Sequence, residues 1–150
     1  MKVLLAIDGS SGSDSAIQEI ARRPWPADTE IKIITAVEMP IVIGLEPWAA
    51  SLAYFEELEL SIRRTAQEII EAALTELDRL RKTLRVTTKI IQGPPRQVIV
   101  DEADCWNADL IVMGSRGLGA WNRLLLGSVS SAVVHHAKCS VEIVRQGCAA

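Results

Sequence analysis

Short runs of apolar residues alternate along the chain with stretches in which apolar residues recur every three or four positions. Uninterrupted runs are typical of strands buried on both faces, and periodic stretches are typical of helices that pack by one face. Strands are expected at residues 2–7, 31–37, 86–92, 110–113 and 141–144. Helices are expected from Ser13 or Asp14 to about Arg23, from Leu52 to about Leu84, from Pro95 to about Trp106, and from Ser128 to about His136. This alternation predicts an α/β fold, a parallel sheet with helices on both faces.

Size and charge limit the classes of protein that fit. The 150 residues suit a single domain, 1–150, and a net charge of −3 argues against the basic face that a nucleic-acid groove needs. No apolar stretch approaches membrane-spanning length, and the apolar N-terminal run is too short for a signal peptide, so we expect a cytoplasmic protein that does not contact membranes. Three cysteines without a C-x-x-C pair, and two adjacent histidines, indicate neither a disulfide framework nor a metal site.

The segment after the fourth predicted strand carries regularly spaced glycines. Two residues separate Gly114 from Gly117, nine separate Gly117 from Gly127, and Ser128 follows, which gives the pattern G-x2-G-x9-G-S. Glycines let a ligand approach the backbone, and N–H groups at a helix start attract anions. We therefore expect a phosphate cradle made by the backbone N–H groups of Gly117, Ser128, Val129 and Ser130. The hydroxyls of Ser128 and Ser130 either add hydrogen bonds to phosphate or cap the helix.

A carboxylate stands at the end of the first predicted strand. Asp8 is followed there by the turn residues Gly9 and Ser10. In dinucleotide sites an acidic residue at such a position accepts hydrogen bonds from ribose hydroxyls, and we expect the same of Asp8. The alternative use of this carboxylate is a local turn with Gly9 and Ser10.

The glycine pattern, placed after a fourth strand, resembles the nucleotide-binding motif of the universal stress protein family. The resemblance extends from Lys2 to Arg145, and the complete motif is similar to that of the ATP-binding branch. It implies one open five-stranded parallel sheet in the order 3-2-1-4-5, a Rossmann-like fold related to the adenine nucleotide alpha hydrolases. In that order the first and fourth strands are neighbours. Asp8 and Gly114 would then meet at the carboxyl ends of the strands, where such sheets bind ligands.

The resemblance also implies roles for individual residues. Ala6 and Ile7 would contact the base, and Val37 would offer backbone groups to adenine. Met113 and Gly114 would line the ribose side, with Arg116 beside Gly117 at the edge of the loop. Arg123, inside the nine-residue spacer, either reaches a phosphate or is solvated. The predicted nucleotide-binding set is Ala6, Ile7, Asp8, Val37, Met113, Gly114, Arg116, Gly117, Gly127, Ser128, Val129 and Ser130. One departure from the family is Cys139-Ser140, where members often have Cys-Pro.

These residues predict a stress-response or signalling module that binds ATP or AMP and regulates through its occupancy. The phosphate-clamping Lys of G-x-x-x-x-G-K-[ST] is absent, so turnover is expected to be at most slow ATP hydrolysis, with Mg²⁺ bridging the phosphates, and enzyme status stays open. One alternative is an adenylating enzyme, because residues 10–15 are similar to the S-G-G-x-D-S loop of ATP pyrophosphatases. The other is a dimeric scaffold that binds no ligand.

Two further segments carry expectations about contacts. The fifth strand is predicted to be an apolar sheet edge, and exposed edges invite pairing. We therefore expect a two-fold homodimer through Ser140 to Arg145, as family members often form. The irregular apolar segment from Glu38 to Ser51 either folds over a ligand or covers the helix that follows it.

Overall fold

The computed structural model describes residues 1–39, 52–80, 84–117 and 126–145 of the chain. The strands are β1 (Lys2–Ala6), β2 (Glu30–Val37), β3 (Arg85–Gln92), β4 (Leu110–Gly114) and β5 (Ser140–Val144). The helices are α1 (Ser11–Arg22), α2 (Leu52–Leu80), α3 (Pro95–Trp106) and α4 (Ser128–His136). The predicted alternation of strands and helices is therefore confirmed.

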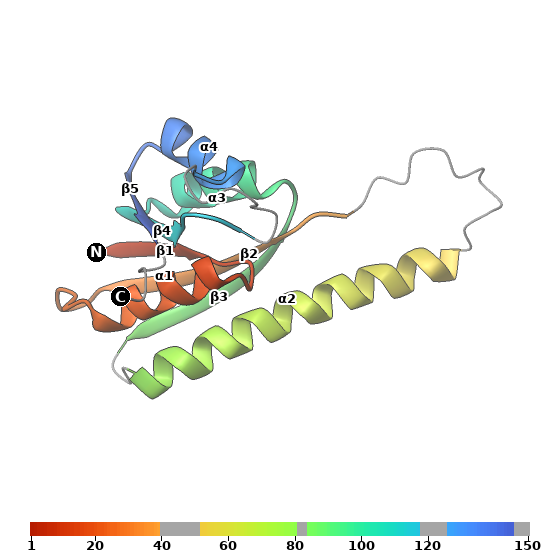
Figure 1. Ribbon diagram of the computed structural model, residues 1–150, viewed down its shortest axis with the longest axis horizontal. Coiled ribbons are helices and arrows are strands. Elements are labelled where there is room, and N and C mark those ends of the chain that lie inside the picture. The colour runs from red at the N-terminus through yellow and green to blue at the C-terminus, as the bar shows by residue number, and fades with distance from the viewer. Residues whose placement is uncertain (40–51, 81–83, 118–125, 146–150) are drawn as a thin grey trace.

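All five strands run parallel in one sheet ordered β3-β2-β1-β4-β5, which confirms the predicted order (Figure 1). In this register Ala6 of β1 lies opposite Ile34 of β2 on one side and Met113 of β4 on the other. The connections after β1 lead to one edge of the sheet, and those after β3 lead to the other edge. The carboxyl ends of β1 and β4 therefore flank the point where the strand order reverses.

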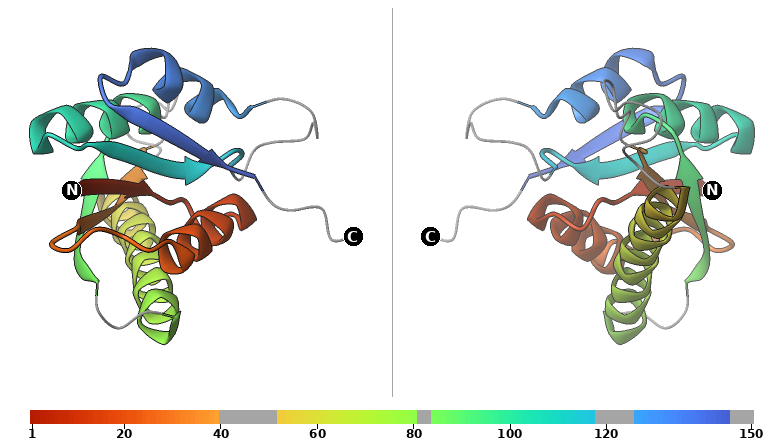
Figure 2. Two further views of the ribbon diagram at one scale, coloured as in Figure 1. Left: turned by 90° about the vertical axis from the view of Figure 1, so that its left-hand side faces the viewer. Right: turned by 90° about the vertical axis from the view of Figure 1, so that its right-hand side faces the viewer.

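Helices cover both faces of the sheet (Figure 2). On one face Ile17 and Ile20 of α1, with Ile70 of α2, pack against a cluster of buried strand residues. On the other face Ile99 of α3 and Val133 of α4 do the same. The central strand is buried from both sides because its side chains alternate between these clusters, and Val3, Leu4 and Leu5 have no exposed area.

The prediction that α1 starts at Ser13 or Asp14 is wrong by about one turn. The helix begins at Ser11, because the Ser10 hydroxyl accepts a hydrogen bond from the Ser13 backbone N–H at 3.3 Å and so caps the helix. The chain offers hydroxyls at positions 10, 11 and 13, each of which is a good cap by type. Contacts outside the helix, described below, decide between them.

Some predictions fall on residues outside the described ranges. They are the greater part of the apolar segment from Glu38 to Ser51, and Arg123 in the glycine spacer. Among the helices of the described ranges, none combines the length and the apolar character needed to cross a membrane.

Candidate functional site

Two turns from distant parts of the sequence meet at the carboxyl ends of β1 and β4. The first comprises residues 7–10 after β1, and the second comprises residues 115–117 after β4. A Cβ atom added to Gly117 would overlap Oδ2 of Asp8, so the Gly117 backbone lies directly against this carboxylate. The structure therefore brings together the acidic strand tip and the second glycine of the motif.

Local hydrogen bonds orient the carboxylate of Asp8. Its Oδ1 accepts from the Ser10 backbone N–H at 3.0 Å and from the Ser13 hydroxyl at 2.7 Å, while the Asp8 backbone N–H donates to the Ser13 oxygen at 2.9 Å. Gly9 has a φ of +79°, which lets the chain turn sharply between strand and helix. The local-turn use of Asp8 is thus present through Oδ1, whereas Oδ2 lies on the Gly117 side.

The start of α1 is fastened to the segment after β4. The Ser10 hydroxyl donates to the Arg116 carbonyl at 3.2 Å. A Cβ on Gly114 would lie within 2.5–2.8 Å of three backbone atoms of Gly12, and a Cβ on Gly12 would overlap the Arg116 carbonyl oxygen. Two backbones can approach this closely only where neither carries a side chain. The same contacts fix the first turn of α1, which explains why the helix begins at Ser11.

The start of α4 is held against the same segment. The Gly127 N–H donates to the Ser115 carbonyl at 2.9 Å, and the buried Ser130 hydroxyl lies 3.1 Å from the Ser115 carbonyl and 3.0 Å from the Gly127 carbonyl. This hydroxyl therefore donates to backbone carbonyls and does not cap the helix, whose N-cap residue, Gly127, carries no side-chain cap hydrogen bond. The backbone N–H groups of Ser128, Val129 and Ser130 precede the first intrahelical bond, from Ser131 N to Gly127 O, and helix geometry gives them no partner inside the described part of α4, so they can face an anion.

Four other residues of the predicted nucleotide-binding set lie at the ends of the strands. The side chains of Ala6, Ile7 and Met113 are buried, so these residues form a floor at the strand ends. Val37 ends β2, and its carbonyl already accepts a hydrogen bond from the Gly93 N–H at 2.9 Å. The Val37 carbonyl is therefore not available to an adenine ring in this arrangement.

Sequence reasoning missed several residues that build these turns. Gly12 lies in the stretch noted for its similarity to another enzyme class, Ser13 was expected only as a possible start of α1, and no residue pattern marks Ser115. Their importance comes from contacts across the sheet, which the order of residues along the chain does not show. A carboxylate followed by closely spaced serines and a glycine is the one signal that pointed to Ser10 and Ser13.

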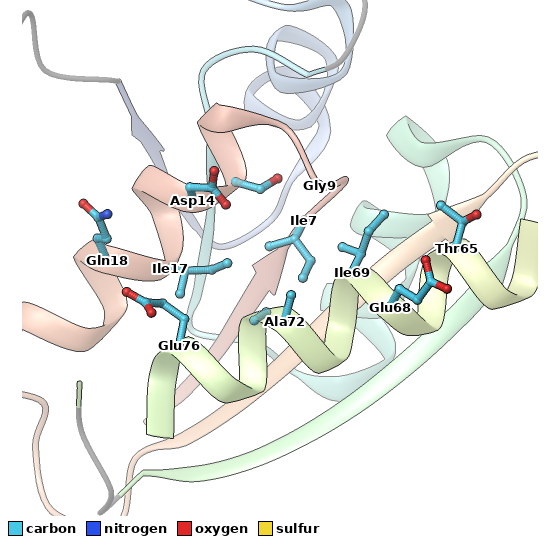
Figure 3. A pocket seen from close by; sticks show the side chains of 12 residues that line it. Ile7, Gly9, Asp14, Ile17, Gln18, Thr65, Glu68, Ile69, Ala72 and Glu76 are labelled. Atoms are coloured by element: carbon cyan, nitrogen blue, oxygen red, sulfur yellow. The ribbon is translucent and has the colours of Figure 1, made fainter. Parts of the chain in front are cut away.

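A separate hollow of about 540 Å³ lies between α1 and α2 (Figure 3). Apolar side chains line it, including Ile7, Ile17 and Ile69. Asp14 and Glu68 add carboxylates, and no basic side chain is among its lining residues. Among its lining residues, Ile7 is the one member of the predicted nucleotide-binding set. Carboxylates without a compensating cation repel phosphate, so this hollow does not suit the charged end of a nucleotide.

The described residues hold no cluster of three or more His, Cys, Asp or Glu side chains able to bind a metal ion. Asp8 is the carboxylate at the convergence of the β1 and β4 turns. A cation that accompanied a nucleotide there would be held largely by the phosphates.

Comparison with known proteins assigns the chain to a family. The model of the universal stress protein family matches residues 1–145. The chain belongs to the universal stress protein family. A universal stress protein of Thermus aquaticus is 36% identical over 146 residues, covering 95% of this chain and 97% of its own length. Another, from Methanocaldococcus jannaschii, is 31% identical over 147 residues, covering 97% and 82% respectively.

Solved structures of universal stress proteins and of similar proteins share the fold. Hypothetical protein MJ0577 matches with a TM-score of 0.81 at 23% identity, covering 99% of this chain and 97% of its own. A universal stress protein in complex with cAMP gives a TM-score of 0.71 at 24% identity, covering 98% of each chain. An Arabidopsis thaliana family member with AMP bound gives 0.71 at 21% identity, covering 99% and 93%. Adenine nucleotides thus bind to proteins of this fold.

Proposed function

We propose that this universal stress protein binds an adenine nucleotide, ATP or AMP, where β1, β4 and the start of α4 converge. The contact between the Asp8 carboxylate and the Gly117 backbone carries the proposal, because it joins the two halves of the predicted set. Asp8 would accept from the ribose hydroxyls. The N–H groups that begin α4 would bind phosphate, with each favourable charge contact at a helix start contributing about 0.3–1 kcal/mol.

The role we infer is regulatory, within a cytoplasmic stress-response or signalling pathway. Nucleotide occupancy would alter the loops at the strand ends and so the affinity for a partner, with Mg²⁺ accompanying ATP and hydrolysis at most slow. The structure weakens the adenylating-enzyme alternative, because residues 11–15 belong to α1 rather than to an open loop. Within that stretch, Gly12 packs against the Arg116 carbonyl.

The direct test is mass spectrometry of nucleotide released from natively purified protein, followed by calorimetric titration with ATP and AMP. The wild-type protein should release an adenine nucleotide and bind it again. Gly117→Val places a branched side chain against Oδ2 of Asp8, and we expect its affinity to fall at least about tenfold, or 1.4 kcal/mol. Val134→Ala changes an exposed residue farther along α4 and should bind as the wild type does.

Three results would overturn the proposal or change it. Wild-type protein that carries no nucleotide and gives no heat with ATP or AMP would favour the ligand-free scaffold. Equal loss of affinity in Gly117→Val and Val134→Ala would place the site elsewhere. Release of pyrophosphate from ATP in the presence of a carboxylate substrate would establish the adenylating enzyme.

A further inference from the structure

Two buried serines support the two turns that form the proposed site. Ser13 of α1 is 4% exposed, and Ser130 of α4 is 2% exposed. The Ser13 hydroxyl donates to a carboxylate of the protein, and the Ser130 hydroxyl donates to backbone carbonyls. A hydroxyl has a single proton, so one that donates inside the protein has none to donate to a ligand. Both side chains are therefore placed to hold other groups of the site in position.

The Ser13 hydroxyl closes a small hydrogen-bonded ring with Asp8. It donates to Oδ1 of Asp8 at 2.7 Å and accepts from the Asp8 backbone N–H at 2.9 Å. Hydrogen bonds to a carboxylate are stronger than those between neutral groups, and two bonds to one residue fix the rotation of its side chain as well as its position. The ring turns Oδ1 toward α1, while Oδ2 lies on the side of Gly117. Ser13 thus determines which carboxylate oxygen lies on the Gly117 side.

The Ser130 hydroxyl ties the start of α4 to the end of β4. It lies 3.1 Å from the Ser115 carbonyl oxygen and 3.0 Å from the Gly127 carbonyl oxygen. The Gly127 N–H donates to the same Ser115 carbonyl at 2.9 Å. Ser115 and Gly127 enclose the segment that contains the nine-residue glycine spacer. These contacts fix where α4 begins relative to β4, and so they fix the N–H groups that would bind phosphate.

Serine hydroxyls reach the turn after β4 from opposite faces of the sheet. Figure 2 shows α1 on one face and α4 on the other. Ser10, the cap of α1, accepts from the Ser13 N–H at 3.3 Å and donates to the Arg116 carbonyl at 3.2 Å. The consecutive carbonyls of Ser115 and Arg116 are thus held by hydroxyls from α4 and from the cap of α1. Because different hydroxyls hold the two halves of the site, the support of one half can be removed while the other stays.

We propose that Ser13 and Ser130 are positioning residues, each of which sets the discrimination of one part of the nucleotide. Ser13 acts through the Asp8 carboxylate and determines how well ribose hydroxyls are recognised. Ser130 acts through the start of α4 and determines how well phosphate is recognised. Groups that are held in place before binding lose less freedom when the ligand arrives, so each serine raises affinity without touching the ligand. The inference rests on the proposed nucleotide site and adds the residues that decide between ligands sharing the adenine base.

Calorimetric titration with ATP, 2′-deoxy-ATP, 3′-deoxy-ATP and adenosine separates the two roles. The ribose ratio is the dissociation constant of the weaker deoxy analogue divided by that of ATP. The phosphate ratio is the dissociation constant of adenosine divided by that of ATP. We expect both ratios to be at least about tenfold in the wild type, because each compares a ligand with and without hydrogen bonds that involve a charged group.

Substitution of each serine should change one ratio and leave the other. Ser13→Ala should lower the ribose ratio at least about threefold and keep the phosphate ratio, and Ser130→Ala should do the reverse. Each variant is the control for the other, because a general loss of stability weakens all the ligands alike. Ser15→Ala removes a hydroxyl that donates to the Ser11 carbonyl at 3.0 Å within α1, and it should keep both ratios. Ser13→Thr retains the hydroxyl and should retain the ribose ratio.

Amide hydrogen exchange of the ligand-free protein, followed by NMR, tests the two supports without nucleotide. The Ser10 N–H donates to Oδ1 of Asp8 at 3.0 Å, so it should exchange faster once Ser13→Ala releases that carboxylate. The Gly127 N–H should exchange faster in Ser130→Ala, because the start of α4 is then held less firmly against β4. Each amide should keep its wild-type rate in the other variant.

The outcomes distinguish this inference from the function on which it rests. Variants that bind ATP with unchanged ratios, whatever their exchange rates, would overturn the inference and leave the nucleotide site standing. A changed ratio without faster exchange would mean that the serine contacts the ligand directly and is not a positioning residue. Equal falls of both ratios in both variants would overturn the separate roles. Wild-type protein that binds none of the ligands would overturn the proposed function, and with it the assignment to ribose and phosphate.

Discussion

The three glycines of the G-x2-G-x9-G-S motif differ in how much space the surrounding atoms leave for a side chain. A side chain on Gly117 would collide with the carboxylate of Asp8, and one on Gly114 would collide with the backbone of Gly12. At Gly127 an added Cβ meets its nearest atoms at 3.4–3.5 Å, which is ordinary contact, and the backbone there has φ −62°. In the sequence the three glycines form one motif. Only at Gly114 and Gly117, however, does the surrounding structure leave no room for a side chain.

Gly114→Ala and Gly127→Ala should therefore differ in stability. We expect Gly114→Ala to lower the free energy of unfolding by about 1–3 kcal/mol, because α1 must shift away from β4 to make room. Gly127→Ala should change it by less than about 0.5 kcal/mol. Urea unfolding followed by circular dichroism measures both. Equal losses in the two variants would contradict this account of the motif.

The resemblance to universal stress proteins, through the strand order that it implies, predicted Asp8, Gly114 and Gly117 at one end of the sheet, and the structure places Gly117 against Asp8 and Gly114 against Gly12 there. The sequence did not indicate that Gly12 is the partner of Gly114, because that contact depends on how closely α1 approaches β4. The sequence likewise did not show that the Val37 carbonyl accepts a hydrogen bond from the Gly93 N–H. A motif can therefore predict which residues belong to a site. It does not predict which other residues of the protein they contact.

Among the elements, α3 is tied to the sheet by a buried carboxylate. Glu102 of α3 accepts hydrogen bonds from Lys32 of β2 at 2.9 Å and from Lys89 of β3 at 2.7 Å. The side chains of Glu102 and Lys32 are only 9% and 16% exposed, and the Lys32 ammonium also lies 4.4 Å from the centre of the Trp106 ring. Burial raises the pKa of Glu102, but the two lysine hydrogen bonds outweigh it and the net pKa is lowered.

Glu102→Ala should show a stability loss that depends on pH. A carboxyl whose folded pKa is lowered stabilises the fold above its ordinary pKa of 4.5, and loses that contribution as pH falls through the lower folded value. The variant should be less stable than the wild type by about 1–3 kcal/mol near neutral pH, where it leaves two lysines without their acceptor. Urea unfolding should show this difference shrinking as the solution is acidified below pH 4.5.

Glu76→Ala is the control for that experiment. Glu76 lines the hollow between α1 and α2 and pairs with the exposed Arg79 one turn along the same helix, where water screens the interaction, so its removal should leave the unfolding midpoint nearly unchanged at either pH. A Glu102→Ala difference that stays constant on acidification would contradict the role given to the carboxylate.

Most helices and strands could be predicted from the sequence, because the way each element is buried determines its pattern of apolar residues. Strands buried on both faces produce uninterrupted apolar runs, and helices packed by one face produce periodic ones, so every strand and helix of the described ranges was expected. The start of α1 was not expected, because the hydroxyls at positions 10, 11 and 13 are equivalent as caps by residue type, and the hydrogen bond from Ser10 to Arg116 distinguishes them. Local pattern determines which element forms, and a tertiary contact determines where this one begins.

For the molecule as a whole, β5 remains an open edge of the sheet. It neighbours β4 alone, and its side chains are already used by the covering helices. Glu142 forms two hydrogen bonds with Arg23 just after α1, at 2.6 and 2.7 Å, while Val141 and Ile143 pack toward α3 and α4. These contacts fix the side chains of the strand on both faces of the sheet and leave its outer backbone edge as the part that another strand could pair with.

We predict that Ile143→Lys abolishes a homodimer formed through Ser140 to Arg145. The expected observation is a fall in sedimentation mass from dimer to monomer, and circular dichroism must establish that the variant is still folded, because Ile143 also packs against the cluster under α3 and α4. Val134→Lys, on the exposed face of α4, should keep the wild-type mass. A folded Ile143→Lys protein with an unchanged mass would show that the chain associates elsewhere or not at all.

The backbone contact between Gly12 and Gly114 has a consequence for biosynthesis. A ribosome completes β1, α1 and β2 long before Gly114 leaves the exit tunnel, and closing a loop of that size is slow. Until then the nascent chain contains the turn after β1 but lacks the turn after β4, so the proposed nucleotide site is incomplete. A ligand held between the two halves would consequently discriminate finished chains from truncated ones, and would protect only the former from proteolysis.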